Sequence, residues 1–119
     1  MWRYYSILTW RVWQDGGHGI TNKSLRYFDS LKGKLGMIHK IHIDGDRHMS
    51  MEIEAINGVV LLSGVNCGYG GEGPHGAITI LEKLGIGNDT LKAKILNNNP
   101  VNITQVDAEL APLGGLGSW

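Results

Sequence analysis

One glycine-rich segment holds the residues whose types and spacing best suit binding chemistry. Residues 65–77 read VNCGYGGEGPHGA and contain five of the chain's eighteen glycines. Glycine permits positive φ angles and close approach of a ligand or another backbone. Pro74 suits the first turn of a following helix, whose unsatisfied N–H groups and positive dipole end hold anions. The segment therefore predicts a site for a phosphate-bearing or otherwise anionic small molecule.

A shorter glycine cluster, residues 16–19, is similar to residues 73–76. Each cluster contains one histidine, follows a predicted strand and lies near the start of a predicted helix. Two such units could together hold two phosphates of a nucleotide-like ligand through backbone N–H groups. Alternatively, both clusters are ordinary glycine-rich turns, since a chain with eighteen glycines produces such similarities by chance.

Neither cluster matches a nucleotide-binding fingerprint. No Lys-Ser or Lys-Thr follows a Gly-x-x-x-x-Gly pattern, which excludes a P-loop. Residues 68–73 satisfy Gly-x-Gly-x-x-Gly, but the strands before them predict an antiparallel meander rather than a parallel dinucleotide-binding unit. Tyr69 could stack on a purine or ribose, or support its own loop, and Glu72 could accept hydrogen bonds from ligand hydroxyl or amino groups.

The predicted ligand-binding residues come from both clusters and include one cation as a phosphate clamp. They are Arg11, Gly17, His18, Tyr69, Gly70, Gly71, Glu72, Gly73, His75 and Gly76. Arg3, Arg26 and Arg47 are further candidate clamps.

The residues support catalysis or metal binding less well than they support ligand binding. Cys67 could act as a nucleophile with His75 as base, but no third orienting group is evident. His18 and His75 could act as the acid and base of a phosphodiesterase, yet neither belongs to the His-x-Thr or His-x-Ser pairs that such enzymes carry. The five histidines lack metal-ligand spacing. We predict no catalytic residue, metal or cofactor.

The composition of the chain limits which classes of function and location remain. A chain of 119 residues has one core, and eleven basic residues balance eleven acidic ones. The balance does not favour bulk nucleic acid or a membrane surface as partner. Cys67 is the single cysteine, and no stretch has the length of a signal or membrane-spanning segment. A cytoplasmic location is expected.

The pattern of elements predicts one α+β domain over residues 1–107 and an extended tail over 108–119. The sheet is expected to be mainly antiparallel, in the order β-α-β-β-β-α-α-β, with two or three short helices. Strands are predicted at 4–13, 37–44, 48–56, 59–65 and 101–106. One helix is predicted to start after a cap at Thr21 or Asn22. A second is predicted to span 77–84, and a third to span 90–96 after a cap at Asp89.

Two hairpin turns set the predicted registers. A three-residue loop, 45–47, places Lys40 opposite Glu52 and Ile41 opposite Met51. An Asn57-Gly58 turn places Ala55 opposite Val60.

The tail and the four tryptophans favour self-association. Apolar residues recur at every third position of the tail, which suits an extended segment docked in a groove of its own chain or of a neighbour. We expect a homo-oligomer with the ligand site near the subunit boundary.

These observations together predict non-enzymatic binding of a nucleotide-derived signal, such as a cyclic nucleotide or a cyclic ADP-ribose relative. Small phage proteins that sequester such signals have this size and kind of site. The alternatives are a small hydrolase or phosphodiesterase acting on the same ligand, and a glycine-rich assembly protein without a ligand.

Overall fold

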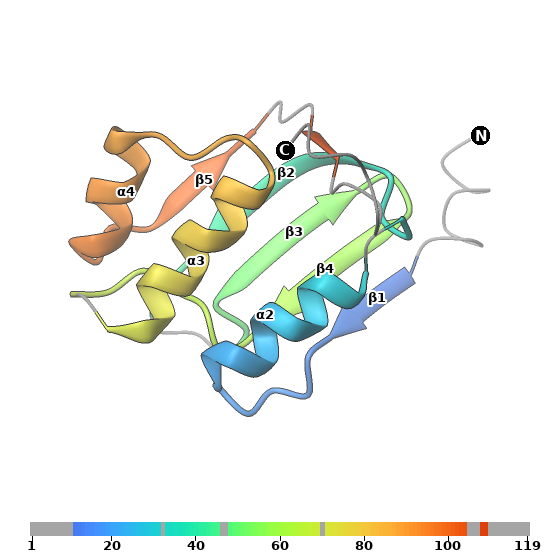
Figure 1. Ribbon diagram of the computed structural model, residues 1–119, viewed down its shortest axis with the longest axis horizontal. Helices are drawn as coiled ribbons and strands as arrows, with labels where there is room; N and C mark the ends of the chain where they lie inside the picture. Colours follow the sequence, from blue (N-terminus) through green and yellow to red (C-terminus); the bar gives the residue numbers. More distant parts are fainter. Residues whose placement is uncertain (1–10, 32, 46–47, 70, 105–107, 110–119) are drawn as a thin grey trace.

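The computed structural model describes residues 11–31, 33–45, 48–69, 71–104 and 108–109, which form three helices and one mixed sheet (Figure 1). In chain order the elements are β1 (Arg11–Gln14), α2 (Thr21–Ser30), β2 (Met37–Ile43), β3 (Met51–Ala55), β4 (Gly58–Leu62), α3 (Glu72–Lys83), α4 (Asp89–Leu96), β5 (Val101–Ile103) and β6 (Ala108–Glu109). The predicted α+β class and element order are confirmed. β6 falls within the predicted tail, whose other residues lie outside the described part of the chain.

The strands are arranged in the order β1-β4-β3-β2-β5, and β6 also pairs with β2. β1 pairs with β4 in parallel, from Arg11 opposite Gly58 to Gln14 opposite Leu61. The other described pairs are antiparallel, so the sheet is mainly antiparallel as predicted.

The first hairpin has a longer loop than predicted. The observed opposite pairs are Lys40 with Glu54, Ile41 with Ile53 and Ile43 with Met51. The backbone N–H of Asp44 donates to the Ser50 carbonyl at 2.7 Å, which leaves five residues in the loop instead of three. The predicted register was therefore wrong by two residues. An even shift leaves the side chains from Lys40 to Ile43 on their predicted faces, but a bulge between Ile38 and Lys40 reverses the faces before it, so that Ile38 is buried and Met37 is exposed.

The second hairpin shows the same kind of shift. Ala55 lies opposite Gly58, so Ile56 and Asn57 form the turn instead of Asn57 and Gly58. A Cβ at Gly58 would lie 2.1 Å from the carbonyl oxygen of Arg11. Gly58 is thus required for the close approach of β1, and not for the turn.

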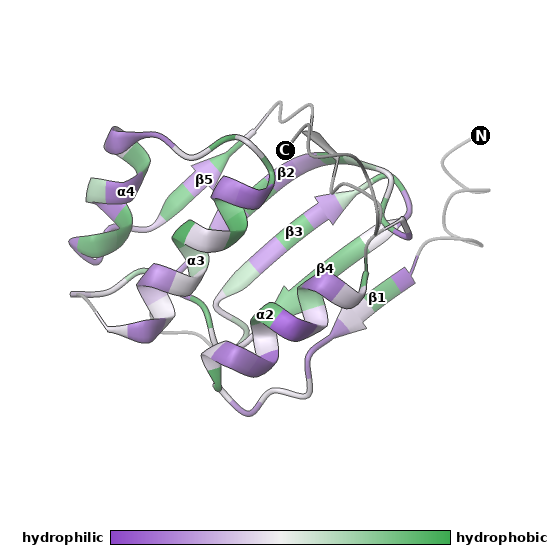
Figure 2. Cartoon of the chain, in the orientation of Figure 1, coloured by the Kyte–Doolittle hydropathy of each residue, from purple (hydrophilic) through white to green (hydrophobic). Residues whose placement is uncertain are grey.

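The core lies between the sheet and helices α2, α3 and α4, which cover the same face (Figure 1). Figure 2 shows the alternation of hydrophilic and hydrophobic residues along β3, as expected for a strand with one buried face. The buried sheet residues include Ile41, Ile53 and Val60, and they pack with helix residues such as Phe28 and Leu81. Among the described residues, no helix has the length and apolar character needed to cross a bilayer.

α3 begins five residues earlier than predicted. Its N-cap is Gly71, with φ +89°, so the segment from Glu72 to Gly76 is helical and not part of a loop. Pro74 is compatible with this position because the first helical residues need no intrahelical N–H partner. Gly76 is buried where α3 meets α2, and a Cβ there would lie 2.6 Å from Thr21 Cγ2. Packing between helices therefore accounts for this glycine.

The caps of the other two helices also differ from the predictions. Ile20, and not Thr21 or Asn22, is the N-cap of α2. In α4 the cap is Asn88, whose side chain accepts a hydrogen bond from Leu91 N, and not Asp89.

Candidate functional site

The two glycine clusters meet at one end of the sheet. Because β1 and β4 pair in parallel, their carboxyl ends lie side by side. Residues 15–19 lead from β1 into α2, and residues 63–71 lead from β4 into α3. Both loops and the starts of both helices lie at the lower left of Figure 1. We call residues 15–19 and 63–71 the rim.

The Asp15 carboxylate connects the two halves of the rim. Its Oδ1 accepts hydrogen bonds from Gly17 N and from Ser63 Oγ, each at 3.0 Å. Its Oδ2 accepts from Ser63 N at 2.8 Å and from Ser24 Oγ. Partial burial raises the pKa of Asp15, but the hydrogen bonds from Ser24, Ser63 and Gly17 outweigh this effect and hold the pKa below its usual range. Asp15 therefore stays ionised and serves as a structural anchor.

Two serines extend this network to the backbone of both loops. Ser24 Oγ accepts from Gly64 N at 2.8 Å, and Ser63 Oγ accepts from Gly19 N at 2.9 Å. Thr21 Oγ1 donates to the Gly64 carbonyl at 2.6 Å. A Cβ at Gly64 would lie 2.4 Å from the Ile20 carbonyl carbon, so the backbones of the two units are in direct contact. The start of α2 is thereby fixed against the end of β4.

The loop before α3 is anchored on its inner side. Cys67 N donates to the Asp44 carbonyl at 3.1 Å, and Gly68 N donates to the Ile95 carbonyl at 2.9 Å. The Asn66 side-chain oxygen is shielded from solvent and has no hydrogen-bond partner among the described residues. A buried amide oxygen without a donor is unusual and costs free energy.

The outer side of this loop is open to solvent. Tyr69 is 83 % exposed, and Gly71, Glu72 and His75 are exposed as well. No described atom lies within 4 Å of the position that a Gly71 Cβ would occupy.

The helices differ in how their N-termini are capped. No side chain caps α2 or α3, whose N-termini lie at the rim, whereas Asn88 caps α4. The first N–H groups of α2 and α3 therefore have no side-chain acceptor from the cap position, and the positive ends of both helix dipoles face the rim.

Cys67 is poorly placed for nucleophilic chemistry. Its side chain is 2 % exposed, and its Sγ lies 3.8 Å from Asn98 Oδ1. Burial raises the pKa of the Cys67 thiol, and the nearby Asp44 carboxylate raises it further. A thiol of raised pKa carries little thiolate near neutral pH.

The structure brings most of the predicted site residues to the rim and to the first turns of α3. Gly17, His18, Tyr69 and Gly71 belong to the rim; Glu72, Gly73, His75 and Gly76 belong to α3. Gly70 lies outside the described residues. Arg11 lies at the other end of β1, apart from the glycine loops.

Three of the predicted glycines are explained by packing. Gly76 allows α2 and α3 to approach, as described above. A Cβ at Gly73 would lie 2.4 Å from Asn66 Oδ1, and one at Gly17 would lie 2.8 Å from His48 Nε2.

The sequence patterns did not indicate the residues of the anchor network or one neighbour of the rim. They are Asp15, Ser24 and Ser63, which form the anchor network, and His48, which lies against Gly17. The Asp-Gly-Gly turn could have identified Asp15, because an aspartate before glycines commonly accepts backbone N–H bonds. Nothing in the spacing indicated its serine partners, which lie 9 and 48 residues away.

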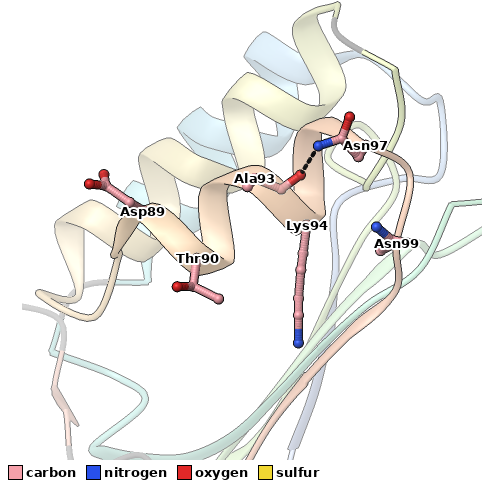
Figure 3. A pocket seen from close by; sticks show the side chains of 6 residues that line it. All are labelled: Asp89, Thr90, Ala93, Lys94, Asn97 and Asn99. Atoms are coloured by element: carbon pink, nitrogen blue, oxygen red, sulfur yellow. Dashed lines mark hydrogen bonds between the residues drawn. The ribbon is translucent and has the colours of Figure 1, made fainter.

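A cavity of about 440 Å³ lies along α4 and the turn after it (Figure 3). Its lining residues are Asp89, Thr90, Ala93, Lys94, Asn97 and Asn99. Asn97 Nδ2 donates to the Ala93 carbonyl at 2.7 Å, and Thr90 and Lys94 point to the same side of the helix. The lining carries one acidic and one basic side chain and includes none of the predicted site residues.

No protein-family model, curated protein or solved structure matches this chain. In the described part of the chain, no group of three or more His, Cys, Asp or Glu side chains is placed to hold a metal ion.

Proposed function

We propose that this protein binds a phosphate-bearing, nucleotide-derived small molecule at the rim without transforming it. The parallel pairing of β1 with β4 is the observation that carries the proposal, because it puts two glycine loops and two helix N-termini at one place. In sheets with parallel strands, ligands bind outside the carboxyl ends of the strands.

The start of α3 is the best candidate for the phosphate position. It lacks a side-chain cap, and Gly71 at the N-cap has a positive φ and open space around it. An anion placed there gains hydrogen bonds from backbone N–H groups and the favourable end of the helix dipole. His18 and His75, both exposed, can add positive charge when protonated.

Tyr69 and Glu72 suit the remainder of such a ligand. The exposed Tyr69 ring offers a face for a purine or ribose. Glu72 can accept hydrogen bonds from hydroxyl or amino groups, although its charge in the first turn of α3 opposes each phosphate charge placed nearby. A ligand with one phosphate, such as a cyclic nucleotide, fits this balance better than a cyclic ADP-ribose-like ligand, which carries two.

Binding without turnover is the activity that these groups support. The Asp15 carboxylate is occupied by hydrogen bonds from its own chain, and the Cys67 thiol is buried with a raised pKa. A protein that binds and releases its ligand unchanged could sequester a cyclic nucleotide or cyclic ADP-ribose-like signal.

The test compares two glycines at opposite ends of α3. Gly71 and Gly85 both have positive φ and no described atom within 4 Å of a Cβ, so Ala at either position strains the backbone by about 1–3 kcal/mol. Titration calorimetry with cyclic AMP, cyclic ADP-ribose and inorganic phosphate should show binding of at least one probe by the wild type. Gly71→Ala should weaken that binding by about tenfold or more, and Gly85→Ala should not.

Equal affinity of the wild type, Gly71→Ala and Gly85→Ala for the bound probe would exclude the rim as the binding site. Chromatography of the probes after incubation provides the second readout. Repeated conversion of a probe by the wild type would replace the proposal with the hydrolase alternative.

A further inference from the structure

A second cavity, of about 470 Å³, opens at the amino end of β1, at the other end of this strand from the rim. It is lined by Arg11, Trp13, Lys34 and Asn57. Its volume lies within the usual range for small-molecule sites.

Hydrogen bonds join the three segments that form this cavity. Arg11 N donates to the Asn57 carbonyl at 3.0 Å, and Asn57 Nδ2 donates to the Lys34 carbonyl at 2.9 Å. Asn57 N donates to the Leu35 carbonyl at 3.2 Å. The start of β1, the turn between β3 and β4, and the segment after α2 are thus held together by the fold.

The described lining of this cavity carries two cationic side chains and no acidic one. Arg11 and Lys34 form no ion pair with a described residue, and no described carboxylate lines the cavity. By contrast, Lys83 pairs with Asp29 and Lys92 with Glu82. Two unpaired cations in one concave site attract an anion, and the Arg11 guanidinium can bind phosphate with two parallel hydrogen bonds.

Trp13 gives the cavity an aromatic wall. It is partly buried and packs against the core, so the core supports the indole ring on one side. An indole held in this way presents a flat surface on which a planar ring can stack without losing much side-chain entropy.

We propose that this cavity binds an aromatic ring that carries a phosphate, the chemistry of a nucleoside monophosphate. The ring stacks on Trp13, and the phosphate lies between Arg11 and Lys34. Asn57 Nδ2 donates to the Lys34 carbonyl, and the Asn57 side-chain oxygen can accept a hydrogen bond from an amino group of the ring. This site is separate from the rim and does not depend on the function proposed there.

Titration with AMP tests the proposal, with NMR of the Trp13 indole N–H as a local readout. The signal of Trp13 is identified by its loss in Trp13→Leu. Wild type should bind AMP with a shift of this signal, and Arg11→Gln, Lys34→Gln and Trp13→Leu should each weaken binding by about tenfold. Lys40→Gln removes an exposed cation on β2 and should leave the affinity unchanged.

Titrations with adenosine and with inorganic phosphate test the two halves of the ligand one at a time. Each should bind at least tenfold more weakly than AMP, and equal binding of either would overturn the proposal. Absence of AMP binding by the folded wild type would overturn it as well. AMP binding lost in Gly71→Ala but retained in Arg11→Gln and Lys34→Gln would assign AMP to the rim and reject the cavity. Both cationic side chains are exposed, so their replacement leaves the core intact.

Discussion

At the scale of single residues, Asp15 is the side chain on which the rim depends most. Its carboxylate accepts four hydrogen bonds, two from backbone N–H groups and two from serine hydroxyls. The donors belong to the loop after β1, the loop after β4 and helix α2. One carboxylate thus joins the loop after β1 and the first turn of α2 to the loop after β4, whose Ser63 lies 48 residues away in sequence.

Asp15→Asn should lower the free energy of unfolding by about 1–3 kcal/mol at pH 7, because an amide cannot accept on both sides of the group. The pKa of Asp15 is lower in the folded than in the unfolded chain, so its ionised form stabilises the fold above about pH 4, and this contribution is lost as the pH falls through the folded pKa. Urea denaturation at pH 7 and pH 3 should therefore show a smaller difference between wild type and variant at pH 3.

Asp29→Asn is the matched control for this measurement. The Asp29 carboxylate pairs with Lys83 at 2.6 Å, but both side chains are partly exposed. Exposed ion pairs contribute about 0–1 kcal/mol. An equal loss of stability in both variants at pH 7 would contradict the role given to Asp15.

At the scale of elements, the contact between α2 and α3 brings together the two helices that follow the rim loops. Gly76 permits this close packing. A Cβ at position 76 would lie against Thr21 on one side and 2.8 Å from Val65 Cγ1 on the other. Gly76→Ala should destabilise the fold by about 1–3 kcal/mol through overpacking. Thermal or urea denaturation measures the effect.

Gly87→Ala provides the comparison, since its Cβ would meet the flexible Glu82 Cγ at 3.3 Å. Its effect on stability should be close to zero. If Gly76→Ala were as stable as wild type, close helix packing would not explain the glycine at position 76.

The elements were more predictable than their boundaries. Alternation and turn residues were sufficient to predict the meander from β2 to β4. An error of two residues preserves the faces from Lys40 onward, but the bulge between Ile38 and Lys40 was not predicted. The start of α3 was missed because glycine and proline at positions 73, 74 and 76 have low helix propensity. Tertiary contacts override that propensity here, with Gly76 packed against α2.

The position of the candidate site was predictable from the glycine clusters, but its construction was not. Sequence similarity between the two clusters suggested two units, and only the β1–β4 pairing places them together. Most of the anchor hydrogen bonds join residues 40 or more positions apart. Contacts of this range leave no pattern in a single sequence.

At the scale of the whole molecule, β1 stands at one end of the strand order, so within the described sheet its outer edge has no partner strand. Such edges, together with exposed apolar side chains, favour association with another chain. Val12 on this strand is 54 % exposed, and Ile56, in the turn that precedes β4, is 59 % exposed. The predicted homo-oligomer could form through this edge. The tail was the other predicted contact, and its residues 110–119 lie outside the described part of the chain.

Light scattering at micromolar concentration should give a mass above that of one chain for the wild type. Val12→Lys should lower this mass, because a charged side chain on an edge strand disfavours pairing. Ile20→Lys is the control, since Ile20 is also exposed, at 45 %, but lies outside the edge strand. A wild-type monomer would exclude self-association, and an unchanged mass in Val12→Lys would exclude this edge.

The four residues of β1 have the rim at one end and the cavity of Arg11 and Trp13 at the other. A ligand at either end of β1 that binds only when β1 is paired with β4 raises the population of the paired state. By thermodynamic reciprocity, each ligand then raises the affinity for the other by the same factor. If both ligands require the docked strand, this short parallel strand would thus couple the two sites.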